Sequence, residues 1–544
     1  MKVARTLASA IALAAGVTLG AQQEYLAGFE PKLAPKLLRH VRASGVVLAE
    51  YRHAGSVLVR LSPAQAARLA AMPGVSYVAP NQAVRGLAAA RDYGYESVGG
   101  PKARSYGWTG KNIGVAVIDS GIFDHNDLKG TGFGNNRIVY TEDFTGGDGK
   151  DNFGHGTLVA GIIAGNGKES TGQGYTHTFR GLAPDVKLLN LKVLNSNGIG
   201  VDSAVIAAIN RAIQLRKRYN IRVINLSIGR PVSAGYRQDP LCQAVEAAWN
   251  SGIAVVAAAG NMGRDNSFGT HGYATITSPG NDPKVITVGA FNTVGTTSPS
   301  DDILTSYSSK GPAAIDHIVK PDLVAPGNNI VGLLASNTTI SDYYTANRIP
   351  FSLYYPSSSG LSDKYYRLSG TSMAAPMVTG AVALMLQKQP SLTPDQVKAR
   401  LMRTALKLGP QQGTVTDAAT GVSYRVNHDI FSVGAGYLDV PAALADTTPT
   451  TLAATSPSAT YDASTGAVSL VFGTNVVWGT NVVWGTNVVW GTNVVWGTNV
   501  VWGTNVVWGT NVVWGTNVVW GTNVVWGASN PAASTGNILI FGDM

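Results

Sequence analysis

The chain has 544 residues, of which 45% are hydrophobic and 13% are charged, with a formal net charge of +9. This length and composition are typical of a globular protein with a large core and more than one domain, and they exclude a disordered chain. The positive charge lies largely in residues 1–90 and is otherwise scattered, without a basic stripe or a basic helix face. We therefore expect no nucleic-acid partner.

The chain starts with a segment typical of a signal peptide, over residues 1–21. Lys2 and Arg5 precede an uncharged, mostly apolar stretch over residues 6–19, and small residues follow at 20–21. A membrane anchor is the alternative, but the apolar stretch is short and rich in alanine for a stable span. We therefore predict a secreted protein.

The lone cysteine, Cys242, excludes an intrachain disulfide. It lies in an apolar helical pattern, so we expect a buried, inert thiol rather than a nucleophile. The stability of a secreted chain without disulfides has to come from its core. Structural calcium stays open as an additional source, but the sequence locates no ligands for it.

Residues 22–90 are predicted to form a small α+β unit. Its predicted elements are two strands, a helix opened by Ser62 and Pro63, and a third strand, at 45–51, 56–61, 62–72 and 75–78 respectively. From about Gly86 to Gly100 the chain is rich in alanine and glycine and loses its pattern, which predicts a linker.

Residues 91–444 are predicted to form an α/β domain, because apolar strands alternate with helical segments. Near-continuous apolar strands joined by helices indicate a mostly parallel sheet covered on both faces, which is a three-layer fold. The predicted strands are 113–118, 186–193, 223–228, 253–259 and 285–290. Helices are predicted between them over 202–218 and 241–250, and after Thr393, which has the pattern of a capping box.

The last hundred residues differ from the rest of the chain. Residues 445–472 are predicted to be an exposed linker, because they include a Thr/Ser/Pro/Ala stretch without apolar periodicity. Residues 473–526 are nine unbroken copies of Gly-Thr-Asn-Val-Val-Trp, and residues 527–544 form a C-terminal tail. Duplication of a tolerated unit explains the copies without any function. The alternatives are a β-rich meander or a β-helix, whose uncharged edges favour self-association or retention at the cell surface.

Four segments carry residue types suited to acyl transfer. An apolar strand ends on Asp119, at the edge of a parallel sheet where ligand crevices form. His155 lies between two glycines at the start of a helix, and Ser372 opens a long apolar helix whose N–H groups favour a developing oxyanion. Asn261 follows another strand and offers a neutral amide donor. Taken singly, each residue has a structural explanation as a helix cap, a locally packed histidine or a turn former.

Together these segments resemble the signature blocks of the subtilisin-like serine peptidases, the subtilase family. The blocks are VIDSG at 117–121, HGT at 155–157 and GTSMAAP at 370–376, in the family's order of acid, histidine and serine. The resemblance covers about 100–444 and implies a subtilisin-like fold. Residues 45–86 resemble, more loosely, the family's inhibitory propeptide. The resemblance thus implies a serine endopeptidase that is made as a zymogen, processes itself and is inhibited by its own propeptide.

The resemblance also implies a role for each residue of the site. Ser372 would attack the carbonyl of a protein or peptide substrate, while His155 takes and later returns its proton and Asp119 holds the imidazole. Asn261 and the backbone N–H of Ser372 would bind the oxyanion. No cofactor is expected for catalysis.

Substrate binding is assigned by the same resemblance. Two edge strands, at 198–200 and 227–229, would pair with an extended substrate, which favours broad specificity because main-chain pairing ignores side chains. The residue before the scissile bond would be apolar, since Met262 stands where an acid could select basic side chains. The residues assigned to these contacts are Gly198, Gly200, Ser227, Gly229, Ala258 and Gly260.

Two features leave alternatives open. Leu158 replaces the second histidine of the family's His-Gly-Thr-His pattern, which affects the expected packing more than the chemistry. A Tyr-rich stretch over 343–366 is typical of a variable insertion, without an assigned role. Two other functions compete with a secreted protease. The first is adhesion at the cell surface by a protein whose protease-like domain is non-catalytic, and the intact site residues argue against it. The second is proteolysis inside the cell, and the predicted signal peptide argues against it.

Overall fold

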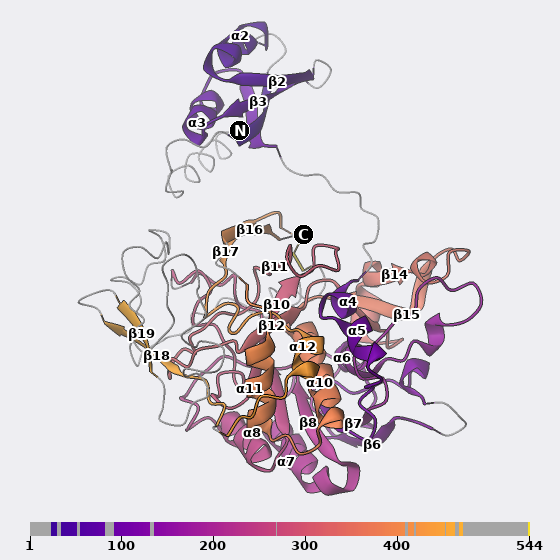
Figure 1. The fold of residues 1–544 in the computed structure, drawn as a ribbon. Coiled ribbons are helices and arrows are strands. Elements are labelled where there is room, and N and C mark those ends of the chain that lie inside the picture. Colours follow the sequence, from indigo (N-terminus) through magenta and orange to yellow (C-terminus); the bar gives the residue numbers. More distant parts are fainter. Residues whose placement is uncertain are drawn as a thin grey trace. The chain divides into compact units, whose positions relative to one another are not determined.

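The computed structural model describes residues 23–29, 34–51, 55–81, 92–130, 135–267, 269–408, 412–417, 420–451, 453–462, 467–471 and 542–543. The predicted signal peptide and the predicted repeats lie outside the described residues. The chain divides into two compact units, Met1–Ala88 and Ala89–Met544, which are described one at a time (Figure 1).

In its described residues, the first unit consists of a four-stranded antiparallel sheet and two helices. The strand order is β2-β3-β1-β4. The strands are β1 (Gln23–Phe29), β2 (Val46–Tyr51), β3 (Ser56–Leu61) and β4 (Val75–Pro80), and the helices are α2 (Ala34–Ser44) and α3 (Pro63–Ala70). Ser62 caps α3 in a capping box, since its Oγ accepts a hydrogen bond from the backbone N–H of Gln65, and the Gln65 side chain accepts one from Ser62.

This unit has a hydrophobic core of its own. Val57 and Val59 of β3, Leu37 and Val41 of α2 and Leu69 of α3 are buried together. The three predicted strands and the predicted helix are confirmed, whereas β1 and α2 were not predicted from the sequence.

The second unit is built on an eight-stranded sheet. The order is β11-β10-β9-β8-β5-β7-β6, with β12 also paired to β10, and every pair is parallel except β10 with β11. The strands are β5 (Gly114–Asp119), β6 (Ile138–Asp143), β7 (Lys187–Lys192), β8 (Ile221–Leu226), β9 (Ala254–Ala258), β10 (Ile286–Asn292), β11 (Ile303–Leu304) and β12 (Leu323–Pro326). The predicted α/β class with a mostly parallel sheet is confirmed.

Two pairs of long helices pack against this sheet. Helices α7 (Asp202–Tyr219) and α8 (Pro240–Asn250) contact each other and strands β8 and β9, whereas α6 (His155–Ala164) and α10 (Thr371–Lys388) form a second pair. Both α6 and the first four turns of α10 are buried on all sides, which explains their near-continuous apolar sequences. The remaining helices are α4 (Gly94–Ser97), α5 (Gly100–Ser105), α9 (Thr339–Tyr343), α11 (Pro394–Thr404) and α12 (Val440–Ala445).

Smaller sheets complete the unit. They are β13 (Ile330–Leu333) with β14 (Arg348–Pro350) and β15 (Leu361–Leu368), β16 (Gln412–Thr416) with β17 (Ser423–Asn427), and β18 (Ser458–Asp462) with β19 (Ala467–Val471). The Tyr-rich stretch forms α9, β14 and β15, with Tyr365 and Tyr366 buried in the core. The described part of this unit also contains short 3₁₀ helices at Asn126–Leu128, Lys168–Ser170, Thr345–Asn347 and Phe351–Leu353.

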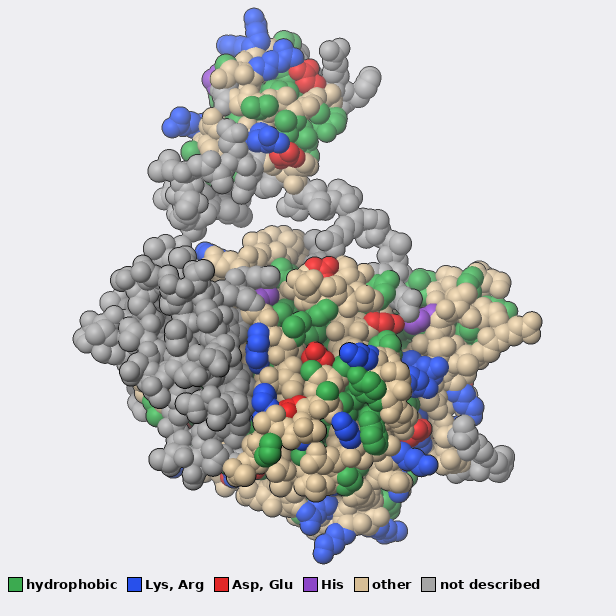
Figure 2. Space-filling view, viewed as in Figure 1, with side chains coloured by type: hydrophobic (Ala, Val, Ile, Leu, Met, Phe, Trp, Pro, Cys, Tyr) green, Lys and Arg blue, Asp and Glu red, His purple; other side chains and the backbone are tan. Residues whose placement is uncertain are grey.

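The distribution of charge on the surface and the apolar character of the helices relate to possible nucleic-acid and membrane partners. On the face that Figure 2 shows, Lys and Arg side chains are scattered among neutral ones and form no continuous stripe. Among the helices that the structure describes, none combines the length and the apolar character needed to cross a bilayer.

The linker predicted from about Gly86 to Gly100 extends too far, because the structure is already helical before Gly100. Residues 94–97 and 100–105 form helices, and the Asp92 carboxylate accepts hydrogen bonds from the backbone N–H groups of Gly94 (2.6 Å) and Val331 (2.8 Å). The long-range hydrogen bond from Val331 attaches the segment to the body of the second unit from Asp92 onward. The sequence alone does not show this attachment, because the helices are too short to produce a periodic pattern.

The predicted exposed linker over 445–472 is wrong from Ala454 onward, whereas the described residues of 445–453 are exposed or half-buried. Ala454, Ser456 and Ala459 are buried, and the backbone N–H of Ser456 donates to the carbonyl oxygen of Pro283 at 2.9 Å. Ser458 pairs with Ile318, and the hairpin β18–β19 follows. Small Thr, Ser, Pro and Ala side chains carry no apolar periodicity, yet they allow a chain to approach the body closely and to pair its backbone groups with it.

Candidate active site

Asp119 and His155 are in direct contact at the carboxyl edge of the sheet. Asp119 ends β5, which is paired on both sides, and it is 1% exposed. Its Oδ1 lies 2.7 Å from Nδ1 of His155 and also accepts a hydrogen bond from the backbone N–H of Ser120 at 2.7 Å. Among the described residues, Oδ2 of Asp119 has no hydrogen-bond partner. Burial lowers the pKa of His155, but the charge of Asp119 and its hydrogen bond outweigh burial and raise that pKa above its ordinary value.

A second carboxylate, Asp151, fixes the start of α6. Its Oδ2 accepts hydrogen bonds from the N–H and Oγ1 of Thr157, at 2.9 and 2.6 Å, and its Oδ1 accepts one from the N–H of Gly154 at 2.7 Å. The hydroxyl of Ser120 links this acid to β5, since it donates to Asp151 at 2.9 Å and accepts from the N–H of Gly156 at 2.9 Å. The orientation of His155 therefore depends on Asp151. Sequence analysis missed this residue, although an acid shortly before a helix is a common capping signal.

Ser372 lies in the first turn of α10 and is held against Ser227. Its Oγ donates to the carbonyl oxygen of Ser227 at 3.0 Å, and the Ser227 hydroxyl donates back to the carbonyl oxygen of Ser372 at 2.8 Å. In the described part of the chain, Ser372 makes no hydrogen bond with His155. Because Ser372 is the second residue of the helix, its backbone N–H has no acceptor within the helix.

Asn261 is oriented by the segment that precedes Ser372. Its Oδ1 accepts hydrogen bonds from the N–H (2.9 Å) and the Oγ1 (3.0 Å) of Thr371. Because Oδ1 of Asn261 is bonded to Thr371, the Nδ2 group is the part of the amide that remains as a donor, and it lies beside Gly370. A Cβ at Gly370 would lie 3.1 Å from Nδ2, and the residue has φ +146°, so a glycine is favoured at this position for both reasons.

The residues assigned to substrate binding lie at or after the ends of strands of the main sheet, and the pairing of the two segments with an extended substrate stays a prediction. Strand β7 ends at Lys192 and β8 ends at Leu226, and neither 198–200 nor 227–229 pairs with another strand of the described residues. A β-strand is defined by its hydrogen-bonded partner, so the sequence pattern alone cannot create one here. Gly198 and Gly200 follow β7, Ser227 and Gly229 follow β8, and Ala258 and Gly260 lie at and after the end of β9.

Leu158 and Cys242 are both core residues. Leu158 is fully buried, and a Cβ added at Gly332 of β13 would lie 2.5 Å from its Cγ. The leucine that departs from the family pattern therefore packs α6 against β13. Cys242 is buried in α8, where burial raises the pKa of its thiol, which agrees with the expectation of an inert side chain.

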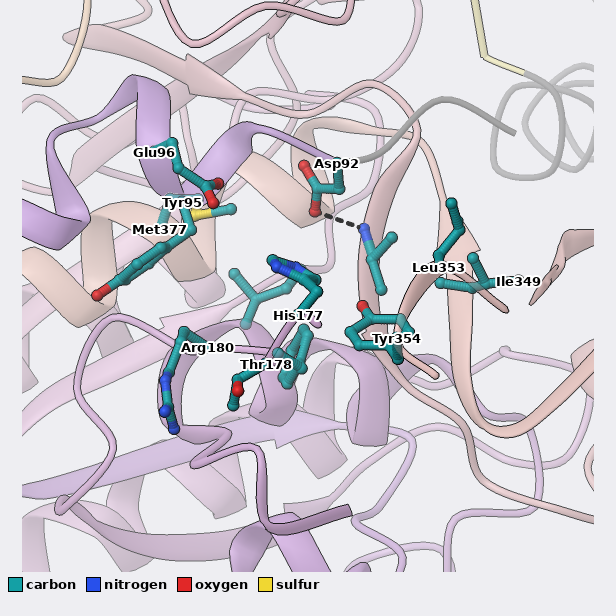
Figure 3. Close-up of a pocket in the computed structure, with 13 residues that line it drawn as sticks. Asp92, Tyr95, Glu96, His177, Thr178, Arg180, Ile349, Leu353, Tyr354 and Met377 are labelled. Atoms are coloured by element: carbon teal, nitrogen blue, oxygen red, sulfur yellow. Dashed lines mark hydrogen bonds between the residues drawn. The ribbon is translucent and has the colours of Figure 1, made fainter. Parts of the chain in front are cut away.

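A separate cavity of about 190 Å³ lies beside α4 (Figure 3). It is lined by Asp92, Glu96, His177, Arg180 and Tyr354 among others, and by none of the residues predicted to act in catalysis. Figure 3 shows the Asp92 carboxylate bonded to the backbone of Val331 at its rim. Burial raises the pKa of Asp92 to about 6. Within the residues that the structure describes, no group of three or more His, Cys, Asp or Glu side chains could hold a metal ion.

Comparison with known proteins agrees with this geometry. The model of the subtilase family matches residues 110–436. The chain is 39% identical to serine protease AprX of Bacillus subtilis over 300 residues, which are 54% of this chain and 61% of AprX, so the match spans less than two thirds of that relative. It is 36% identical to subtilisin DY of Bacillus licheniformis over 58% of this chain and 92% of the relative. It is 33% identical to subtilisin E of Bacillus subtilis over 71% and 86%, respectively.

The matched region contains every segment of the site described above, from β5 through the first turns of α10. A family model that spans more than half of the chain, together with relatives matched over most of their own length, establishes the relationship. The chain belongs to the subtilase family and is a serine endopeptidase.

Proposed function

We propose that this chain is a secreted endopeptidase that acts through an acyl-enzyme formed on Ser372, and that it is made as a zymogen with residues 22–90 as its inhibitory propeptide. The observation that carries the catalytic assignment is the 2.7 Å contact between Asp119 and His155 at the same sheet edge as Ser372. A buried carboxylate on Nδ1 fixes the imidazole tautomer and leaves Nε2 to act as the base.

The reaction starts with a turn of the Ser372 side chain. A hydroxyl has one proton, and that of Ser372 is donated to the carbonyl oxygen of Ser227. Rotation about the Cα–Cβ bond brings the hydroxyl to His155, which takes the proton as Oγ attacks the substrate carbonyl. Asp119 stabilises the imidazolium that forms, consistent with the raised pKa of His155. His155 then returns the proton to the leaving amine, and water hydrolyses the acyl-enzyme by the same steps.

The oxyanion is stabilised by two neutral donors. Asn261 has its amide oxygen occupied by Thr371, so its NH₂ group is the part left to donate. The backbone N–H of Ser372, at the start of α10, is the second donor. Both donors are fixed before the reaction, which is the condition under which such hydrogen bonds lower the barrier most.

Substrate recognition is proposed to be broad, with an apolar residue before the scissile bond. The segments 198–200 and 227–229 offer backbone groups to an extended peptide, and Ile199 is 63% exposed between the two glycines. Ala258 and Gly260 line the proposed pocket with little side-chain bulk. Met262 supplies no charge that would select basic residues.

Self-processing is proposed before Asp92. The first unit folds around its own core, and the second unit holds the chain from Asp92 onward through Gly94 and Val331. The cut predicted between about Gly86 and Gly100 is therefore proposed to fall in 86–91. The repeat tail is proposed to mediate self-association or retention at the cell surface.

The catalytic assignment is tested with Ser372→Ala. This variant is expected to lose hydrolysis of casein and covalent labelling by a fluorophosphonate, which requires a working nucleophile. An exposed-site variant, Asp301→Asn, serves as the matched control and keeps both. Labelling that persists in Ser372→Ala would place the nucleophile elsewhere.

The same variant tests processing. If the chain cuts itself, Ser372→Ala is secreted with residues 86–91 intact, and N-terminal sequencing finds the start that follows the signal peptide. A Ser372→Ala protein that is already cut in this segment would assign the processing to another protease.

A further inference from the structure

The residues Gly542 and Asp543 dock into a polar site on the catalytic unit. Asp543 is 1% exposed, although it lies beyond the repeats, and it forms an isolated antiparallel bridge with Asp417. Its hydrogen-bond partners Ser306 and Asn328 are more than 200 residues away in sequence. Its carboxylate accepts hydrogen bonds from the N–H and Oγ of Ser306, both at 2.6 Å, and lies 2.7 Å from Nη2 of Arg264. The Arg264 side chain is itself 9% exposed, so the ion pair is shielded from water.

The backbone of Asp543 is recognised as well. The side-chain amide of Asn328 donates to its carbonyl oxygen and accepts from its N–H, both at 2.8 Å. A Cβ at residue 542 would lie 2.3 Å from Oδ1 of Asn328 and from Oγ of Ser369, and Gly542 has φ +64°. The site therefore fits a glycine followed by an acid, with the backbone of the acid paired to one amide. We call Gly542 and Asp543 the anchor.

The residues that bind the anchor also support the two segments that carry the proposed oxyanion donors. On one side, Arg264 follows Asn261 by three residues, and the carbonyl oxygen of Tyr307, next to Ser306, accepts the N–H of Gly263 at 2.8 Å. Arg264 also donates to the Ser306 hydroxyl at 2.7 Å. The loop with Asn261 thus supplies Arg264 to the Asp543 carboxylate and is bonded both to Ser306, the second partner of that carboxylate, and to the neighbouring Tyr307.

On the other side, the anchor reaches the segment before Ser372. Asn328 follows Gly327, whose carbonyl oxygen accepts the N–H of Gly370 at 2.8 Å. The Ser369 hydroxyl, which lies close to Gly542, accepts the N–H of Asn329 at 2.9 Å. The anchor therefore joins the loop of Asn261 to the segment of Ser372 through Arg264 and Asn328.

We propose that the anchor is an intramolecular ligand that fixes Asn261 and Ser372 relative to each other, with Asp543 as a positioning residue for the reaction. The proposal rests on the proposed function, because it concerns the oxyanion donors assigned there. Loss of the anchor should lower kcat while KM changes little, since the affected contacts form mainly in the transition state.

Three variants of the full chain test the proposal. Asp543→Ala removes the carboxylate of the anchor. Gly542→Ala introduces the close contacts with Asn328 and Ser369, while every residue of the catalytic unit that binds the anchor keeps its identity. Both are expected to lower kcat about tenfold at a temperature well below either melting point. Asp543→Asn keeps an acceptor for Ser306 and removes the negative charge that faces Arg264, which retains its ion pair with Asp417. This variant should fall between the other two and the wild type. The control Asp301→Asn should match the wild type.

Addition of a peptide separates positioning from simple instability. A synthetic peptide of residues 536–544 should restore kcat in Asp543→Ala and Gly542→Ala, and the same peptide with alanine at the Asp543 position should not. Equal kcat in all variants, a loss confined to melting temperature, or equal restoration by both peptides would overturn the proposal. Rates are taken per fluorophosphonate-labelled enzyme, so an inactive wild type would contradict the proposed function instead.

Discussion

The two edges of the main sheet each bury a carboxylate, but they use it differently. At the carboxyl edge, Asp119 places one oxygen on His155 and Ser120 and leaves the other without a hydrogen-bond partner among the described residues. At the amino edge, Asp322 precedes β12 and has both oxygens occupied. Its partners are the Thr287 N–H (2.8 Å), Lys320 Nζ (2.7 Å), Ser456 Oγ (2.6 Å) and Lys398 Nζ (3.0 Å).

This difference separates a carboxylate that serves a reaction from one that serves the fold. A carboxylate whose two oxygens are both bonded, and whose charge is balanced by two buried lysines, has no free acceptor for another charged group, so its role is to hold its neighbours in place. A carboxylate with an open acceptor beside an imidazole can stabilise the positive charge that forms when the imidazole takes a proton. The predictions below test whether the two edges are as distinct as their contacts indicate.

The largest expected effect comes from Asp119→Asn. It should lower kcat by about 10⁴-fold, the order of loss that removal of the triad carboxylate causes in serine peptidases, because the imidazole loses its tautomer and its counter-charge. Its melting temperature should stay close to that of the wild type. Steady-state hydrolysis of a short peptide measures kcat, and thermal unfolding measures the melting temperature. A stability loss larger than that of Asp322→Asn would contradict the functional difference between the two edges.

Asp322→Asn should act in the opposite way. It leaves Lys320 and Lys398 buried without a full counter-charge, which costs about 3–5 kcal/mol of unfolding free energy. The kcat of the folded enzyme at low temperature should change by less than about twofold, since no contact with the site is lost. Denaturant unfolding of both proteins in the Ser372→Ala background, which prevents autolysis, gives the difference.

The same variant has a pH signature. Burial raises the pKa of Asp322, but the charges of Lys320 and Lys398 outweigh it, so the folded-state pKa lies below the ordinary value. Its contribution to stability is therefore present above an unfolded pKa of about 3.9 and is lost as the pH falls through the folded-state pKa. The stability gap between the wild type and Asp322→Asn should close in that acidic range, and a gap independent of pH would contradict the charge argument.

Ser456→Ala should give a smaller effect at the same edge. It removes the hydroxyl that donates to Asp322 and accepts from Lys398 at 2.9 Å, and the loss of one such hydrogen bond costs about 1 kcal/mol. Thermal unfolding beside the exposed control Ser300→Ala measures it. An unchanged melting temperature would show that the contacts of the segment around Ser456 do not stabilise the fold.

The smallest expected effect is a displaced titration at the catalytic edge. Because Asp119 raises the pKa of His155, protonated His155 is favoured in the folded state, and this contribution to stability is present below about pH 6.5 and lost as the pH rises through the folded-state pKa. Asp119→Asn should move the imidazole titration to lower pH. NMR of labelled histidine in the Ser372→Ala background follows it, and an unmoved titration would remove the electrostatic role of Asp119.

The sequence predicts the catalytic edge well because its signals are local. Asp119 ends an apolar strand, and His155 and Ser372 each open an apolar helix, so short segments contain both the element and the residue. The parallel strands then bring these ends to one edge. Asp151 and the pairing of Ser372 with Ser227 were not predicted, since they depend on which loops meet.

The amino edge and the tail could not be predicted in the same way. Nothing in the sequence around Asp322 shows that its carboxylate meets Lys398 and Ser456. The segment around Ser456 lacks periodicity because its backbone, rather than a hydrophobic face, makes its contacts. Because no predicted site residue lies beyond Thr450, the sequence alone predicts that truncation there leaves hydrolysis of small peptides unchanged. The contacts of Ser456 and the proposed role of the anchor predict a loss instead.

The anchor also changes what a single cut in the tail would mean. In an intact chain the anchor reaches its site as part of the same molecule, so its binding is intramolecular and does not depend on the enzyme concentration. After one cut between Val471 and Gly542, the contact becomes bimolecular, and its occupancy follows the concentration of the released peptide. The degree of dilution, rather than the sequence, would then decide how many enzyme molecules keep their anchor.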